Sequence, residues 1–156
     1  MTNGTDRFAL KSLRFALVAV GLVFVVGIFV LMQLWPSGWQ WQPAHPEYEQ
    51  MIVGIYATLG VFLLVAARDP LEHLSLIWFT VWSSVVHGGI MLVQAVVDPM
   101  ETGHLVGDVP ALLLVAAILA WLTRRAVAEG KRGNVGDPGS GRGDPMSQPE
   151  RHASST

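Results

Sequence analysis

The sequence predicts an all-α integral membrane protein: a bundle of four transmembrane helices followed by a disordered C-terminal tail. Of its 156 residues, 51% are hydrophobic and only 14% are charged, which is too apolar for an ordinary soluble domain of this size. The apolar residues form blocks long enough to cross a bilayer, where about 20 residues are needed. The charged residues lie outside these blocks, so the predicted core is a helix bundle in lipid.

The first apolar block predicts a helix over residues 15–35. It follows a polar and basic segment, residues 1–14, and it contains Gln33 as its one polar side chain. A secretory signal peptide has a shorter apolar region, of about 7–15 residues, and ends at a small-residue cleavage site. This block is longer and runs into tryptophan-rich sequence at residues 35–41, which is typical of the outer membrane boundary. We therefore predict a spanning helix and no cleavage.

Three further blocks predict helices over residues 46–67, 70–97 and 108–123. The sequence DPLE at residues 69–72 offers an N-cap acceptor, a proline at the first helical position and a glutamate at the third, which is typical of a helix start. The sequence DPME at residues 98–101 repeats this pattern, and Gly103 predicts that its helix ends after one turn.

The fourth helix is short for a membrane. Residues 109–123 rise only about 22 Å at 1.5 Å per residue, against a hydrocarbon core of roughly 30 Å. Either Arg124 and Arg125 extend toward the membrane surface from a deeper position, or the helix starts near His104 and bends at Pro110. The second alternative would carry Asp108 into the membrane.

Basic residues predict that both termini lie in the cytoplasm. All ten Lys and Arg residues occur in the N-terminal segment, in the loop between the second and third helices, or after the fourth helix. Such residues favour the cytoplasmic side, so the two loops without them are expected outside. Residues 126–156 are rich in Gly, Ser, Pro and charge, which predicts a disordered cytoplasmic tail.

His87 is the most informative single residue, because it lies near the middle of the third helix and titrates near neutral pH. The side chains at three- and four-residue steps from it, which should share a face toward the bundle interior, are Thr80, Ser83, Ser84, Met91 and Gln94. In a functional role, His87 would relay a proton, ligate haem or a metal, or contact a quinone-like head group. In a structural role it would hydrogen-bond to another helix, with Tyr56, Thr58 or Asp108 as the partner.

No cofactor is predicted. The chain has no cysteine, which excludes thiolate metal sites, iron–sulfur clusters and covalent c-type haem. A bis-histidine b-type haem needs two axial imidazoles at matching depth, and no second histidine lies in the core of a predicted span. The outer loops offer weak candidates for a metal site, namely His45, Glu47, Glu49, Met100, Glu101, His104 and Asp108. Acidic residues gather on any outer surface that lacks basic ones, so we predict no metal there.

Small residues predict where helices approach one another closely. Pairs that offer such surfaces are Gly54 and Thr58, Gly88 and Gly89, and Ala116 and Ala120.

Three segments carry a resemblance: GIYATLG at residues 54–60, SLIWFTVWSSVVH at 75–87 and GHLVGDVP at 103–110. They resemble a bacterial family of small uncharacterised membrane proteins, classed as a domain of unknown function, over roughly residues 47–125. The layout is more distantly similar to that of DoxX-like four-helix proteins. The resemblance implies four helices and a bacterial cytoplasmic membrane, and it transfers no catalytic residue.

Two functions follow as hypotheses. The leading one is a non-enzymatic accessory or interaction subunit that packs against itself or another membrane protein within the lipid bilayer. The alternative is a small binding or transport protein that handles a proton, an ion or a lipophilic head group at His87, with Asp108 nearby. The sequence contains no nucleophile–base pair, phosphate-binding loop or broken-helix substrate site, so an enzyme is not expected. No nucleic acid partner is expected either.

Overall fold

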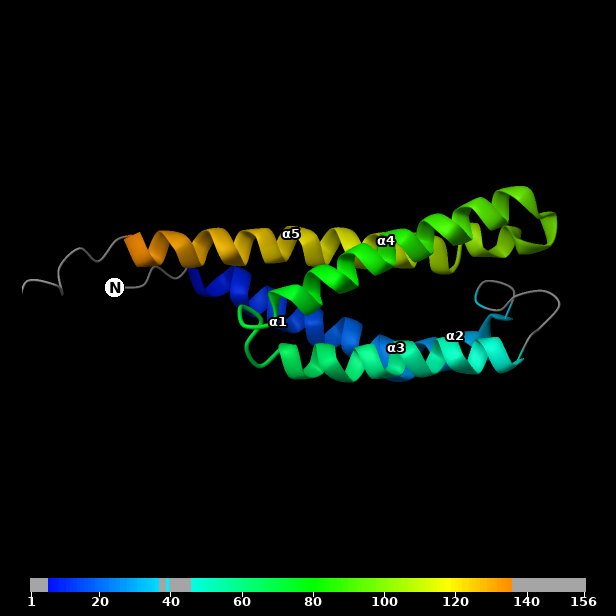
Figure 1. Cartoon of the computed structure of the whole chain (residues 1–156), viewed down its shortest axis with the longest axis horizontal. Helices are drawn as coiled ribbons and strands as arrows, with labels where there is room; N and C mark the ends of the chain where they lie inside the picture. The colour runs from blue at the N-terminus through cyan, green and yellow to red at the C-terminus, as the bar shows by residue number, and fades with distance from the viewer. Residues whose placement is uncertain (1–5, 37–38, 40–45, 136–156) are drawn as a thin grey trace, which may run out of the picture.

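The structure is a computed structural model that describes residues 6–36, 39 and 46–135 (Figure 1). Over these residues the chain is all-α, as predicted, and forms four long helices and no strand. The first helix consists of α1 (Asp6–Leu22), a π-helical turn η1 (Val23–Gly27) and α2 (Ile28–Leu34). The others are α3 (Pro46–Ala66), α4 (Leu74–Val97) and α5 (Asp108–Val135), with a 3-10 helix η3 (Pro99–Leu105) before α5.

The helices run alternately up and down along one long axis (Figure 1). α1 packs against α3 and α5, and α4 packs against α5. α3 and α4 meet at their connecting turn and diverge toward the opposite end of the molecule, where few residues of the two helices touch. The start of α1, the α3–α4 turn and the end of α5 therefore lie at one end, which we call the basic end; η3 and the start of α3 lie at the other.

Three helical stretches are long and apolar enough to cross a membrane: Phe8–Leu34, Leu74–Val97 and Thr102–Lys131. α3 contains a shorter apolar stretch, Gln50–Ala66. Large apolar side chains point outward all along the helices, and Phe15, for instance, is 76% exposed. Such surfaces are typical of helices that face lipid. The chain is thus a helical protein with membrane-spanning character.

Two helices extend farther at the basic end than the sequence predicted. The first begins at Asp6 rather than residue 15, and α5 continues to Val135, past its predicted end at residue 123 and into the predicted tail. Ala9 and Ala126 explain both differences, because each is at most 4% exposed in the apolar core that the two helices share. Tertiary packing of this kind outweighs the weak local signals in polar sequence. The rest of the predicted tail, residues 136–156, lies outside the described residues.

Of the two predicted helix starts, one is confirmed and one is wrong. Asp98 accepts a hydrogen bond from the backbone N of Met100 at 2.9 Å, and Pro99 opens η3. At the other predicted start, the DPLE sequence of residues 69–72, no helix forms, and α4 begins only at Leu74. Pro70 is fully buried there, and its carbonyl accepts from the His73 N–H at 3.2 Å, so this sequence forms the turn between α3 and α4.

The π-helical turn interrupts the first helix halfway along. Phe24 is its buried residue, and from there the residues that face the bundle follow in steps of four, Ile28 and Met32. In a regular α-helix, repeated four-residue steps drift around the axis, because one turn contains 3.6 residues. The wider π turn absorbs part of that drift. It thereby keeps Ile28 and Met32 on the helix face that carries Phe24.

The tightest helix crossing joins α1 and α3 through Gly21 and Gly60. A Cβ atom at Gly60 would lie 2.6 Å from the carbonyl oxygen of Gly21, and one at Gly21 would lie 3.0 Å from that of Gly60. Of the predicted small-residue positions, Gly54 and Gly89 are open: a Cβ atom added at either would have no neighbouring segment within 4 Å among the described residues, while one added at Gly88 would make ordinary contact with α5. The predicted surfaces at Gly54 and Gly89 were therefore wrong.

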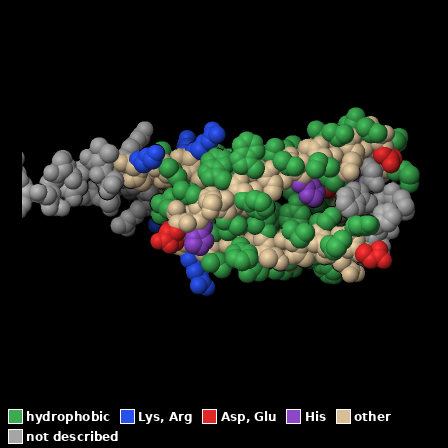
Figure 2. Space-filling view, in the orientation of Figure 1, with side chains coloured by type: hydrophobic (Ala, Val, Ile, Leu, Met, Phe, Trp, Pro, Cys, Tyr) green, Lys and Arg blue, Asp and Glu red, His purple; other side chains and the backbone are tan. Residues whose placement is uncertain are grey.

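Positive charge gathers at the basic end (Figure 2). The described basic residues with placed side chains all belong to segments at this end: Lys11, Arg14, Arg68, Arg124, Arg125 and Lys131. The Arg125 guanidinium lies 4.2 Å from the centre of the Trp121 ring, and that of Arg124 lies 5.8 Å from Trp78. Both arginines thus rest against tryptophans, in the geometry of cation–π contacts.

Candidate functional site

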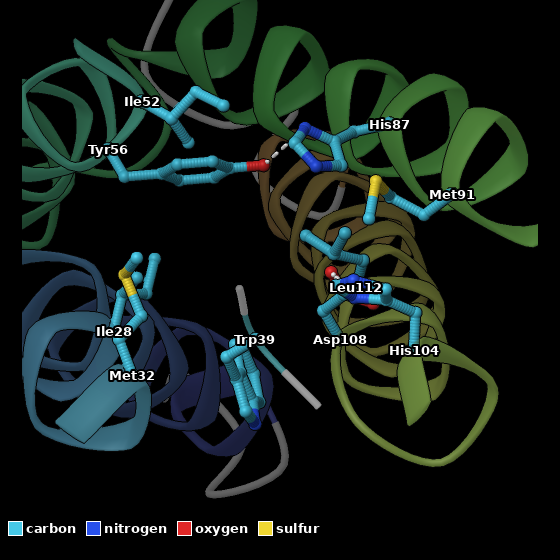
Figure 3. A pocket seen from close by; sticks show the side chains of 10 residues that line it. All are labelled: Ile28, Met32, Trp39, Ile52, Tyr56, His87, Met91, His104, Asp108 and Leu112. Carbon is cyan, nitrogen blue, oxygen red and sulfur yellow. Dashed lines mark hydrogen bonds and ion pairs between the residues drawn. The ribbon is translucent and has the colours of Figure 1, made fainter. Parts of the chain in front are cut away.

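A cavity of about 70 Å³ lies between the diverging helices, away from the basic end (Figure 3). Space of this kind holds on the order of five water-sized groups. Its wall is formed by Ile28, Met32, Trp39, Ile52, Tyr56, His87, Met91, His104, Asp108 and Leu112. These residues come from α2, the segment after it, α3, α4, η3 and α5. The cavity therefore joins all four helices.

One polar part of the cavity wall consists of two side chains that form a hydrogen bond between α3 and α4. The Tyr56 hydroxyl and His87 Nδ1 lie 3.0 Å apart, which confirms Tyr56 among the predicted partners of His87. Tyr56 also packs edge-on against Phe24 of the π turn, with ring centres 4.9 Å apart. Thr58, another predicted partner, is exposed and donates to the Gly54 carbonyl instead. The Tyr56–His87 bond thus ties together two helices that otherwise diverge.

The second polar part of the cavity wall is a buried imidazole–carboxylate pair. His104 Nδ1 and Asp108 Oδ2 lie 2.9 Å apart, and the residues are 1% and 8% exposed. Asp108 is the first residue of α5, where the helix dipole favours a negative group. The pair falls within the apolar stretch Thr102–Lys131. The expectation that these residues share a face is confirmed.

Two hydrogen-bonding atoms in the cavity wall remain unused. Trp39 Nε1 and Asp108 Oδ1 are both buried, and neither has a hydrogen-bond partner within the part of the chain that the structure describes. The indole N–H is a donor and the carboxylate oxygen an acceptor. Buried polar groups are nearly always satisfied, and leaving one unsatisfied costs about 1–3 kcal/mol. Both atoms belong to residues that line the cavity, and both are fully buried.

The predicted polar stripe on α4 reaches the cavity only in part. Thr80 and Ser84 are buried, but the Thr80 hydroxyl donates to the Leu76 carbonyl within its own helix, and that of Ser83 to the Thr80 carbonyl. Of the stripe, His87 and Met91 line the cavity.

Gln94 does not face the interior as predicted. Its side chain is exposed, and the buried face of α4 passes through Met91 and Ala95 instead, at 3% and 1% exposure. At this end of α4, the residue that faces the interior is therefore Ala95, four residues after Met91, and not Gln94, three residues after it.

No metal centre is assembled among the described residues, since no group of three or more His, Cys, Asp or Glu side chains there could hold an ion. Of the weak candidates, Glu47 is exposed and His104 pairs with Asp108. His45 and the side chains of Glu49 and Glu101 lie outside the described part.

Sequence reasoning missed the apolar side of the cavity and Trp39. A signal was present, because each helix contributes residues spaced four apart: Ile28 and Met32, Ile52 and Tyr56, His87 and Met91, and the series His104, Asp108 and Leu112. Residues at this spacing share a helix face. The sequence could not tell which of its many such pairs would meet.

A family model described as a family of unknown function (DUF6632) matches residues 8–138. No curated protein and no solved structure matches significantly.

Proposed function

The chain belongs to the DUF6632 family of unknown function, and we propose that it is a membrane protein that binds a lipophilic small molecule by its polar head group. The head group would occupy the cavity between Tyr56, His87 and Asp108. One observation carries the proposal: the polar side chains of Tyr56, His87 and Asp108 converge from three helices on an otherwise apolar cavity, and Asp108 Oδ1 has no hydrogen-bond partner among the described residues. A polar network that only held helices together would be expected to satisfy its own atoms.

The size of the cavity favours a head group over a whole ligand. Sites for drug-sized molecules measure about 300–1,000 Å³, and this cavity measures about 70 Å³. The remainder of the molecule would have to lie outside it. α3 and α4 diverge around the cavity, and their outward faces are apolar, so an alkyl chain would find suitable surroundings between the helices and the lipid.

The alternative of an accessory subunit stays a hypothesis. Its main support would be apolar surface in need of a partner, but lipid accounts for the outward-facing apolar side chains. A binding site has the cavity as an observation of its own. We therefore place ligand binding first.

We further propose four membrane spans in a bacterial cytoplasmic membrane, with both termini inside. Support comes from the basic end, because Lys and Arg favour the cytoplasmic side. α3 runs beside α1, and its apolar stretch Gln50–Ala66 rises about 26 Å, close to the hydrocarbon thickness of roughly 30 Å. Its exposed apolar residues would then face lipid, like those of the other helices.

Single-cysteine labelling tests this topology, and the absence of native cysteine makes the labelling clean. Glu47 and Glu72 are exposed at opposite ends of α3. In intact cells, we expect a membrane-impermeant maleimide to label Glu47→Cys and not Glu72→Cys, and to label both after lysis. Equal labelling of the two in intact cells would contradict a spanning α3.

Native mass spectrometry of the full chain, extracted gently from its own membrane, tests binding. We expect the wild type to retain a lipophilic small molecule. Met91→Trp places an indole in the cavity and should lower the retained fraction at least tenfold, whereas Leu92→Trp, on the neighbouring lipid-facing position, should retain it. Equal retention by Met91→Trp, or a wild type that carries nothing, would refute the site. Ile52→Phe fills the same cavity and replaces Met91→Trp should that variant not fold.

A further inference from the structure

Positive charge at the basic end is not balanced by acidic groups among the described side chains. These side chains include six basic residues there and three acidic ones, the acidic ones being Asp69, Glu72 and Glu129. None of the six basic side chains forms an ion pair with another described residue. The preference of basic residues for the cytoplasmic side accounts for where these charges lie. It does not account for how two of the arginines are held.

Arg124 and Arg125 both lie against tryptophan rings rather than against acidic groups. The Arg125 guanidinium lies 4.2 Å from the centre of the Trp121 ring on the same helix, and the Arg124 guanidinium lies 5.8 Å from the ring centre of Trp78 on α4. Stacking of this kind covers one face of the planar guanidinium and leaves the N–H groups in its plane available as donors. Both arginines are exposed. Two sets of donors are therefore available at the surface of α5.

The direction of α5 places these donors at the membrane boundary. In an α-helix, each Cα–Cβ bond tilts toward the N-terminus of the helix. α5 finishes at the basic end, so the side chains of Arg124 and Arg125 point back toward the middle of α5 (Figure 1). The Arg125 guanidinium accordingly lies over Trp121, one turn earlier. Tryptophan is typical of headgroup depth, which is also the depth of lipid phosphates.

An exposed apolar stripe leads along α5 to Arg125. Leu114, Ile118, Trp121 and Arg125 follow one another in steps of four, three and four residues, and residues at these steps share a helix face. The three apolar members are 40–60% exposed. A phospholipid along this face would place an acyl chain on the apolar members and its phosphate at the guanidinium.

We infer that the face of α4 and α5 formed by Trp78, Trp121, Arg124 and Arg125, which we call the arginine face, binds the headgroup phosphate of an anionic phospholipid. A guanidinium fits a phosphate, whose oxygens accept two parallel N–H bonds. An anionic lipid is preferred over a zwitterionic one, because the ammonium group of the latter would meet the unbalanced positive charge of this end. The arginine face lies away from the cavity and is independent of the proposed cavity ligand.

Lipid titration of the full chain in detergent, read by native mass spectrometry, tests this site. Two probes share their acyl chains and their phosphate and differ in net charge: dioleoyl phosphatidylglycerol and dioleoyl phosphatidylcholine. We expect the wild type to bind phosphatidylglycerol about tenfold more tightly than phosphatidylcholine, since each nearby Lys or Arg contributes about a factor of five toward an anionic lipid.

Four variants on α5 locate the preference. Arg125→Gln should lower it by about fivefold, and Arg124→Gln/Arg125→Gln should abolish it. Lys131→Gln is the matched control, because it removes the same charge about 9 Å farther along the helix, and should lower the preference by less than about twofold. Trp121→Leu keeps every charge but removes the ring beneath the guanidinium, and should lower the preference by about threefold. All the substituted side chains are exposed, so these variants should fold as the wild type does.

Equal binding of the two lipids by the wild type would overturn the site, as would a preference that survives in Arg124→Gln/Arg125→Gln. Equal losses in Arg125→Gln and Lys131→Gln would also overturn it, since net charge alone would then attract the lipid. Added inorganic phosphate should leave the bound lipid in place, and displacement would assign the arginines to soluble phosphate compounds instead. Met91→Trp should keep the full preference, so a failure of the cavity ligand and a failure of the arginine face can be told apart.

Discussion

Gly60→Ala is expected to destabilise the protein markedly, although alanine is the better helix former. The added Cβ would lie 2.6 Å from the Gly21 carbonyl oxygen and 2.8 Å from Val25 Cγ2. Because the nearest atom belongs to the backbone, the α1–α3 crossing must open. Overpacking of this kind costs about 1–3 kcal/mol, against a gain in helix propensity of up to about 1 kcal/mol. Thermal unfolding in detergent should show a clear net loss.

Gly54→Ala is the matched control on the same helix. Nothing lies within 4 Å of a Cβ atom at Gly54, so the substitution should leave stability unchanged or raise it by up to about 1 kcal/mol. The same chemical change thus has opposite signs at two positions of α3. Equal effects of the two variants would show that α1 and α3 do not cross closely at Gly60.

His104→Leu should have the largest effect of any single change near the cavity. It leaves the Asp108 carboxylate buried without its imidazole partner, and breaking a buried pair in this way costs about 3–5 kcal/mol. The double variant His104→Leu/Asp108→Leu removes both groups and should recover much of that loss, since apolar replacement of a buried pair is often neutral. Thermal unfolding of the wild type, both single variants and the double variant gives the coupling between the two residues.

His73→Leu is the comparison for that series. His73 is half-buried in the α3–α4 turn, at the basic end, and its loss should cost less than about 1 kcal/mol. Strictly additive losses at His104 and Asp108 would contradict the buried pair. A His73→Leu loss as large as that of His104→Leu would mean that the cost reflects imidazole removal in general.

The sequence was sufficient for features that depend on local pattern. Apolar blocks predict the helical class, and α3 begins at Pro46 as expected and ends within a residue of its predicted end. The polar positions around His87 predict an inward-facing stripe with Tyr56 among its partners; the structure confirms the Tyr56 partner, while Gln94 is exposed. Each of these predictions uses residues within one helix, or the rule that a buried polar group needs a partner.

The rest depends on contacts between segments far apart in the chain. Gly21 and Gly60 resemble any other helical glycines until their helices cross, and Gly54 offers the same local signal without a neighbour. His104 occurs in a polar loop sequence, and the packing of η3 against α4 and α5 buries it. The ends of α1 and α5 are set by Ala9 and Ala126 across a helix interface.

The π-helical turn divides the molecule into parts of unequal stiffness. On the side toward the basic end, fully buried side chains such as Leu13, Leu17 and Leu119 form a dense core, and dense packing resists deformation. Beyond Val23–Gly27, the first helix continues past the cavity, and a π turn is a point where helices bend. A small change in the bend at this turn would therefore move Ile28 and Met32 and change the width of the cavity, while the core on the other side of the turn stays in place.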